Sequence, residues 1–202
     1  MSKICILDYG FGNIKSLQNA LKKIGYSPSF FSEKRNENYE FIFIPGVGSY
    51  SKASNIINDP KISGFIKKAN ENKVKFVGIC LGMQLFHTVG YENGKSKGLN
   101  FINGEIIKFP DTFILPVIGW REVYFNEKHK FLSKFDKEKF YFVHSYFASK
   151  VKKSNIVSMS SYNKFDYVSS VSENNYFGTQ FHPEKSGDVG LEFLKILIKD
   201  FN

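Results

Sequence analysis

Short apolar runs alternate with helical periodicity through the first 90 residues, and this alternation limits the folds that the chain can adopt. The apolar runs predict buried strands over residues 3–7, 40–44 and 74–79. Helical spacing predicts helices over 14–24, 51–72 (broken near Pro60) and 81–89. Because strands that alternate with helices form a mostly parallel sheet covered on both faces, we predict an α/β three-layer sandwich.

The second half is richer in Phe, Tyr, Val and Ser, and we expect it to add antiparallel strands to the sheet. The strand-like runs are residues 105–109, 121–125, 140–143, 156–159, 167–171 and 176–181. Residues 188–201 place their leucines on one face, which predicts a closing helix. With no repeat or low-complexity linker, we expect a single domain over residues 1–202.

Composition excludes several classes of function. Hydrophobic residues make up 42% of the 202, which argues against disorder, and the net charge is +9. The lysines are scattered and no Arg-rich stripe or nucleic-acid motif occurs, so we expect no nucleic-acid partner. A basic face suits an acidic protein or an anionic substrate at least as well. No apolar stretch nears the roughly 20 residues of a membrane span, and no signal peptide is recognised. We therefore expect a cytoplasmic protein.

The segment Gly78-Ile79-Cys80-Leu81-Gly82 predicts a nucleophile. It is a cysteine version of the Gly-x-Ser-x-Gly elbow, in which a nucleophile sits on a strained turn between a strand and a helix. Glycines are needed on both sides because side chains there would collide with the neighbouring strand and helix. The helix amino terminus favours a thiolate. The other cysteine, Cys5, lies in an apolar run and is expected to be buried core.

A candidate base lies about a hundred residues downstream of Cys80, in Gln180-Phe181-His182-Pro183-Glu184. A parallel strand ending there would bring His182 to the same sheet edge as Cys80. Glu184 can then accept a hydrogen bond from the far imidazole nitrogen, as the orienting member of a triad does.

The remaining histidines are weaker candidates. His87 is expected to serve packing or to lie on the surface, and His129 lies in a solvated run of charge. His144 ends a strand and can form a wall of the site, but no carboxylate follows it. No Cys/His spacing typical of a metal site occurs, so we predict neither metal nor cofactor.

These motifs together resemble the class I, triad-type glutamine amidotransferases. Residues 78–84 and 180–187 carry the resemblance to the family as a whole. Asp8-Tyr9-Gly10, Pro45-Gly46-Val47-Gly48 and residues 141–146 resemble the glutaminase subunit of imidazole glycerol phosphate synthase, nearly end to end. The resemblance implies a flavodoxin-like sheet and hydrolysis of glutamine to glutamate and ammonia through a thioester on Cys80.

The resemblance also implies roles for further residues. Gly46, Val47 and Gly48 would form an oxyanion strand that works with Leu81 beside Cys80. The residues implied for the glutamine pocket are Gly48, Gln84, His144, Ser145 and Tyr146. For Gln84, the alternative is an ordinary residue on the helix surface.

In the family, ammonia passes to a (β/α)8-barrel synthase partner that contacts the glutaminase mouth, which implies a heterodimer. The positions that match the interface or its gate are Trp120, Arg121, Tyr141 and Lys185. Trp120 is equally compatible with a buried core position, and Lys185 with an ordinary exposed lysine.

One segment departs from the family pattern, in which Pro-His-Met/Ile-Gly-Trp-Asn is usual. The chain has Val117 in place of the histidine and Arg121 in place of the asparagine. A cation in place of a neutral amide alters which partner surface fits. This raises a second hypothesis, a paralogous glutaminase that feeds ammonia to a surface-sugar amidation enzyme. A non-catalytic regulatory module and a cysteine peptidase of similar architecture remain further alternatives.

Overall fold

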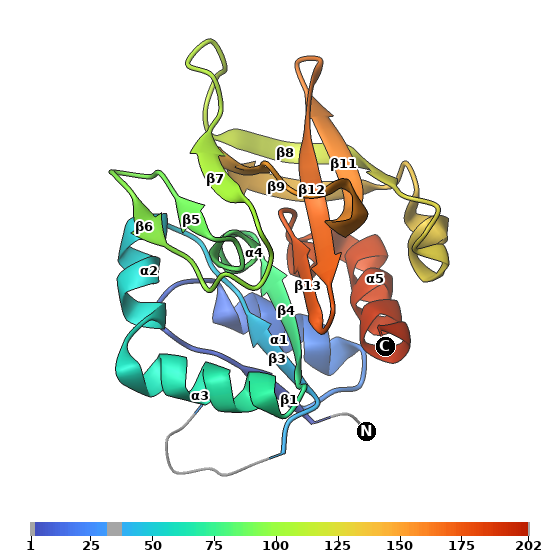
Figure 1. Ribbon diagram of the computed structural model, residues 1–202. Coiled ribbons are helices and arrows are strands. Elements are labelled where there is room, and N and C mark those ends of the chain that lie inside the picture. Colours follow the sequence, from blue (N-terminus) through green and yellow to red (C-terminus); the bar gives the residue numbers. More distant parts are fainter. Residues whose placement is uncertain (1–2, 32–37, 202) are drawn as a thin grey trace.

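A nine-stranded sheet forms the centre of the molecule (Figure 1). The computed structural model describes residues 3–31 and 38–201. The strand order is β2-β1-β3-β4-β13-β12-β11-β8-β9. The strands are β1 (Ile4–Ile6), β2 (Ser29–Phe30), β3 (Phe41–Ile44), β4 (Lys75–Ile79), β8 (Val117–Phe125), β9 (Lys139–His144), β11 (Ile156–Tyr162), β12 (Phe165–Glu173) and β13 (Tyr176–Thr179). The first five in this order are parallel, and β12, β11, β8 and β9 are antiparallel additions, as predicted.

The helices lie on both faces of the parallel part of the sheet (Figure 1). They are α1 (Ile14–Lys23), α2 (Tyr50–Ile57), α3 (Pro60–Glu71), α4 (Leu81–Leu85) and α5 (Gly187–Asp200). Local sequence explains where they begin. The Asn13 side chain caps α1, and Asp59 caps α3 with Pro60 in its first turn, so the predicted break at Pro60 is the start of a second helix.

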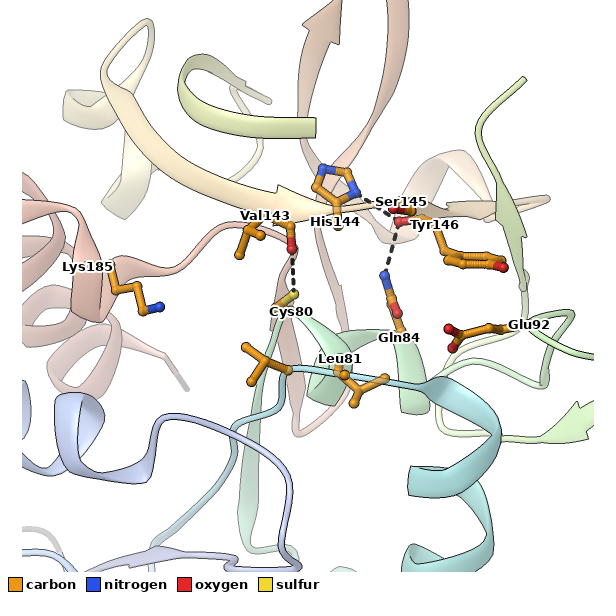
Figure 2. A pocket seen from close by; sticks show the side chains of 11 residues that line it. Cys80, Leu81, Gln84, Glu92, Val143, His144, Ser145, Tyr146 and Lys185 are labelled. Carbon is orange, nitrogen blue, oxygen red and sulfur yellow. Dashed lines mark hydrogen bonds between the residues drawn. The ribbon is translucent and has the colours of Figure 1, made fainter. Parts of the chain in front are cut away.

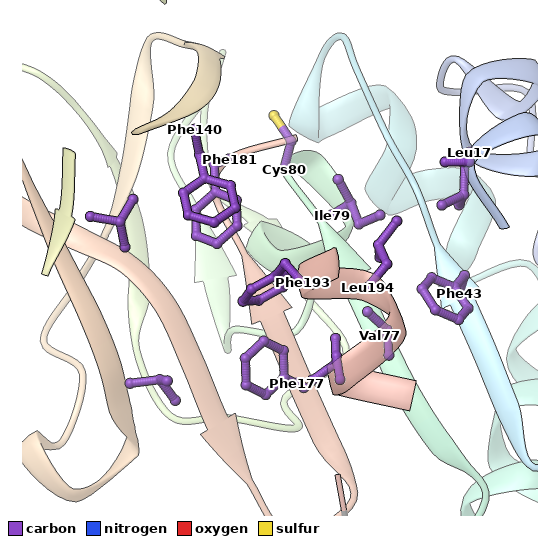
Figure 3. Close-up of a cluster of buried hydrophobic side chains, with 14 of the residues drawn as sticks. Leu17, Phe43, Val77, Ile79, Cys80, Phe140, Phe177, Phe181, Phe193 and Leu194 are labelled. Atoms are coloured by element: carbon purple, nitrogen blue, oxygen red, sulfur yellow. The ribbon is translucent and has the colours of Figure 1, made fainter. Parts of the chain in front are cut away.

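Alternating strand residues divide the core between the two faces. On one face, Phe43 and Val77 pack with Leu17 of α1 and Phe193 and Leu194 of α5 (Figure 3). On the other face, residues such as Cys5, Ile42 and Phe76 pack with α2, α3 and α4. Cys5 is fully buried, as expected for a core cysteine. No helix among the described residues has both the length and the apolar character needed to cross a bilayer.

A second, four-stranded sheet lies beside the carboxyl ends of the parallel strands. Its order is β10-β7-β5-β6, and it consists of β5 (Val89–Gly90), β6 (Ser96–Lys97), β7 (Glu105–Lys108) and β10 (Tyr146–Ser149). Only Ser145 separates β9 of the large sheet from β10 of the small one. The two sheets therefore meet at this corner.

The helix that follows Cys80 is shorter than predicted. We expected a helix over residues 81–89, but α4 ends at Leu85 and a turn leads into β5. The main-chain N–H of Leu99 donates to the Leu85 carbonyl, and those of Phe101 and Ile102 donate to the Phe86 carbonyl. These tertiary partners replace the helical bonds that would have continued α4, so the hydrophobic spacing alone overestimated its length.

Two glycines in helices should respond in opposite ways to alanine. Gly64 is exposed in α3 and a Cβ there would meet nothing within 4 Å, so Gly64→Ala should stabilise the fold by about 0.5–1 kcal/mol. A Cβ on Gly82 would lie 1.7 Å from the Ile44 carbonyl oxygen, so Gly82→Ala should destabilise by several kcal/mol, roughly 3 or more. Urea unfolding of both variants checks this pair, and equal effects would contradict the packing described.

Candidate active site

Cys80 lies on a strained turn between β4 and α4. Its backbone has φ 54° and ψ −108°, a left-handed conformation that costs a non-glycine residue on the order of 1–3 kcal/mol. The turn is held because the Cys80 N–H donates to the Thr179 carbonyl at 2.7 Å, and its carbonyl accepts from the Gln84 N–H at 3.0 Å. Figure 3 shows the sulfur pointing away from the apolar cluster beneath it. The turn therefore presents the thiol to the pocket above the sheet.

The glycines on either side of Cys80 are required by contact. A Cβ on Gly78 would lie 2.7 Å from the main-chain carbon of Gly82, and Gly82 itself lies against β3. Real Cβ atoms are not found at such distances, so the strand and helix can approach this closely only through glycine. This agrees with the collision expected from the sequence.

His182 and Glu184 form a buried pair close to Cys80. β13 runs parallel to β4, and His182 follows β13 at the same sheet edge as Cys80. His182 Nδ1 lies 2.7 Å from Glu184 Oε1, and their side chains are 2% and 4% exposed. His182 Nε2 has no hydrogen-bond partner among the described residues. The geometry leaves Nε2 available to exchange a proton with the thiol.

The charge state of His182 depends on these neighbours. Burial alone lowers its pKa, but the nearby Cys80 and then Glu184 outweigh burial and raise the pKa from 6.5 to about 10. His182 therefore holds a proton at neutral pH. His144 differs, because burial lowers its pKa to about 4. Its neutral ring donates from Nδ1 to the Tyr146 carbonyl at 2.8 Å, which suits a wall residue and not a base.

A cavity of ≈ 330 Å³ opens beside Cys80 where the two sheets meet (Figure 2). This volume suits a small ligand such as an amino acid. The five residues expected from sequence for the glutamine pocket all line it: Gly48, Gln84, His144, Ser145 and Tyr146. Of the other residues expected at the oxyanion, Val47 and Leu81 line the cavity and Gly46 does not. Gln84 is only 5% exposed and donates to the Tyr146 carbonyl at 3.0 Å, which excludes an ordinary helix-surface position. Lys185 also lines the cavity.

Two polar residues of the site were missed by sequence reasoning. The buried Gln180 side chain donates to Cys80 Sγ at 3.5 Å and accepts from Gln84 at 3.0 Å. Its position in the strand-like run, two residues before His182, could have identified it. Glu92 lines the cavity near Tyr146, on the side of Cys80 opposite Lys185 (Figure 2). No sequence signal pointed to Glu92, because β5 was taken as the end of a helix.

The sequence-predicted interface residues divide between two faces of β8. Ile118, Trp120 and Tyr124 are exposed, at 53%, 50% and 43%, so Trp120 is not a core tryptophan. The Trp120 and Tyr141 rings lie 6.3 Å apart, and Lys185 Nζ lies 5.9 Å from the Tyr141 ring centroid. This surface adjoins the cavity mouth, because Lys185 belongs to both.

Val117 and Arg121 lie on the opposite face, because alternate residues of a strand point in opposite directions. Val117 is fully buried, and the Arg121 guanidinium lies 4.7 Å from the Tyr162 ring centroid. Arg121 is thus placed away from the exposed face on which we expected it. Among the described residues, no group of three His, Cys, Asp or Glu side chains could hold a metal ion.

Comparisons with known proteins agree with this geometry. The family model for class I glutamine amidotransferases matches residues 5–197. The subunit HisH of imidazole glycerol phosphate synthase from Geobacillus kaustophilus is 36% identical, over 95% of this chain and 93% of that protein. The protein named subunit HisH 1 from Campylobacter jejuni is 37% identical, over 97% and 99%. A solved structure of PurLQS from Thermotoga maritima shares the fold, with a TM-score of 0.74 at 21% identity over 98% and 99% of the two chains. The chain belongs to the class I glutamine amidotransferase family.

Proposed function

We propose that the chain is the glutaminase subunit of an imidazole glycerol phosphate synthase and that Cys80, His182 and Glu184 carry out its chemistry. The observation that carries this proposal is the strained Cys80 turn, with the 2.7 Å His182–Glu184 pair close by and an amino-acid-sized cavity in front. The near full-length similarity to HisH subunits supports the pathway.

The reaction follows from these positions. The Cys80 thiolate attacks the glutamine side-chain carbonyl, and the oxygen becomes an oxyanion that can accept hydrogen bonds from main-chain N–H groups of Leu81 and of the segment 46–48. His182 then gives its proton to the departing nitrogen, which leaves as ammonia and leaves a thioester. His182 next takes a proton from water, which attacks the thioester and releases glutamate. Glu184 keeps the imidazole oriented throughout.

The cavity suits glutamine as the substrate. Glu92 is the only carboxylate that lines it among the described residues, and it can bind the α-ammonium group of an amino acid. Gln84, His144, Ser145 and Tyr146 supply the rest of the polar wall. A substrate held between Glu92 and Cys80 would present its side-chain amide to the sulfur. Gln180, which donates to Sγ, would keep the sulfur in place.

We further propose that the synthase partner is a (β/α)8 barrel that docks on the exposed surface of Ile118, Trp120, Tyr124 and Tyr141. Exposed aromatic side chains beside a cavity are typical of interfaces. Docking there would cover the cavity mouth and keep ammonia from water. A nucleophilic thiol needs a reducing compartment, which supports a cytoplasmic location.

The sugar-amidation alternative rested on Val117 and Arg121. Neither side chain lies on the exposed face of β8, so their substitution does not argue for a different partner surface. The non-catalytic alternative requires the triad to be idle, and the peptidase alternative requires a long open groove in place of a small cavity.

Supplied to a strain that lacks its own histidine-pathway glutaminase, together with the synthase subunit from the same organism, the chain should restore growth without histidine. Cys80→Ala should abolish both growth and glutamate release, because no other group can form the thioester. Cys5→Ala is the matched control and should retain both, since Cys5 lies in the core away from the cavity.

If the chain releases glutamate but does not restore growth, its ammonia must serve another acceptor, such as a sugar-amidation enzyme. Glutamate release by Cys80→Ala at the normal rate would remove the thiol from the mechanism.

The pH dependence of kcat should report the His182–Glu184 pair. At saturating glutamine, kcat should fall as the pH rises through about 10, because His182 then lacks the proton that the leaving ammonia needs. Glu184→Gln removes a group that raises this pKa, so the fall should move to lower pH. Glu192→Gln, in an exposed ion pair with Lys134, should leave the profile unchanged. An unmoved profile in Glu184→Gln would exclude the proposed role of Glu184.

Trp120→Ala should weaken binding of the synthase subunit by roughly 30-fold, about 2 kcal/mol, as expected for a central interface aromatic. Phe30→Ala is a suitable control, because Phe30 is also exposed but belongs to β2 at the far edge of the sheet. Isothermal titration calorimetry with the synthase subunit measures both. Equal affinities for Trp120→Ala and the unmodified chain would place the interface elsewhere.

A further inference from the structure

The main-chain N–H of Leu81 is occupied in this structure. Leu81 directly follows Cys80, and in a nucleophile elbow the amide after the nucleophile is one of the oxyanion donors. Here that N–H donates to the Gly46 carbonyl oxygen at 3.3 Å. One proton cannot serve both oxygens at full strength, so the Gly46 carbonyl must move away before an oxyanion can be stabilised. The length of the bond makes this exchange inexpensive.

The Tyr9 hydroxyl is an unused donor that lies against Gly46. Tyr9 is 4% exposed, and its hydroxyl has no hydrogen-bond partner among the described residues. It lies directly against Gly46, since a Cβ on that residue would be 2.5 Å from the hydroxyl oxygen and 2.8 Å from Leu81 Cβ. The Leu81 N–H, which now donates to the Gly46 carbonyl, and the free Tyr9 hydroxyl therefore both lie against Gly46.

Tyr9 belongs to a loop that supports the whole segment 46–48. A Cβ on Gly12 would lie 3.3 Å from Gly46 Cα, and a Cβ on Gly48 would lie 3.3 Å from the Phe11 ring. The Tyr9 and Phe11 rings lie 5.8 Å apart. These contacts fix the hydroxyl beside the segment while its glycines keep the backbone free to rotate.

The Tyr9 hydroxyl remains a donor under all working conditions. Burial, and then the charge of Cys80, raise its pKa well above the ordinary value of 10. The group therefore keeps its proton and does not compete with His182 as a base.

We propose that Tyr9 is a positioning residue. Its hydroxyl donates a hydrogen bond to the Gly46 carbonyl oxygen when that oxygen leaves the Leu81 N–H. The exchange frees the Leu81 N–H for the oxyanion and gives the displaced carbonyl a partner. Without the hydroxyl, the carbonyl would lose this alternative donor and would remain on Leu81 for a larger share of the time. This inference rests on the proposed glutaminase function.

Tyr9→Phe tests the exchange in the complex with the synthase subunit. It should lower kcat for glutamate release about tenfold, less than outright loss of an oxyanion donor, and should change KM less than about twofold. The melting temperature should not fall, because the hydroxyl that is removed has no partner in this structure. Alkylation of Cys80 by iodoacetamide should keep its rate, since that reaction forms no oxyanion.

Tyr50→Phe is the matched control. Tyr50 is 1% exposed and its hydroxyl also has no partner among the described residues, but it lies by Gly98 and not by Gly46. Its kcat should equal that of the unmodified chain. An unchanged kcat in Tyr9→Phe, or an equal loss in Tyr50→Phe, would overturn the inference. A fall in alkylation rate parallel to kcat would instead assign the hydroxyl to the thiol. If the unmodified complex released no glutamate, the proposed function itself would fail.

Discussion

The parallel pairing of β13 with β4 is the interaction on which the site depends. It aligns Gly178 with Gly78 and Thr179 with Ile79, so residues about a hundred positions apart leave the sheet at one edge. The Thr179 carbonyl then holds the Cys80 N–H, and the chain beyond it carries His182 to the thiol. A Cβ on Gly178 would lie 2.4 Å from Met83 Cγ, so this pairing also requires glycine. One hydrogen-bonded register thus sets the positions of both the proposed nucleophile and its proposed base.

Much of this could be predicted from the sequence, because the controlling features are local. Gly78, Cys80 and Gly82 predict the turn, and the apolar runs predict which strands are buried. The parallel strands β1, β3 and β4, the antiparallel additions β8, β9, β11 and β12, and the closing helix were predicted correctly. The edge strand β2 was not predicted, and β7 was expected in the large sheet but belongs to the small one. Glu92 and the small sheet were not predicted, because β5, β6 and β10 are two to four residues long and carry no period. Such strands are specified by tertiary partners, in this case by pairing with β7 and with one another.

The alternation of side chains along β8 places its residues on two opposite faces. Trp120 and Arg121 are consecutive residues of a strand, so both could not have faced one partner. Ile118, Trp120 and Tyr124 occupy even positions and lie together on the exposed face. The sequence departures at Val117 and Arg121 belong to the other face, where Arg121 packs on Tyr162. Val117 is buried there, and Arg121 is half-buried.

The position of Tyr141 would give a partner docked on the exposed face of β8 a short physical route to His182, the proposed base. Its ring lies on the exposed face between Trp120 and Lys185, whereas its main-chain carbonyl accepts the His182 N–H at 2.8 Å. Its N–H donates to Ser186 Oγ, whose hydroxyl in turn donates to the His182 carbonyl at 2.7 Å. A partner that shifted Tyr141 would therefore act on the hydrogen bonds of both the N–H and the carbonyl of His182. The segment 46–48 lies across the cavity from β9 and is held by the loop containing Tyr9, so β9 and this segment form separate supports for the base and for the oxyanion. A partner docked at the proposed surface would touch the first support directly, whereas the second lies beside the loop that contains Tyr9.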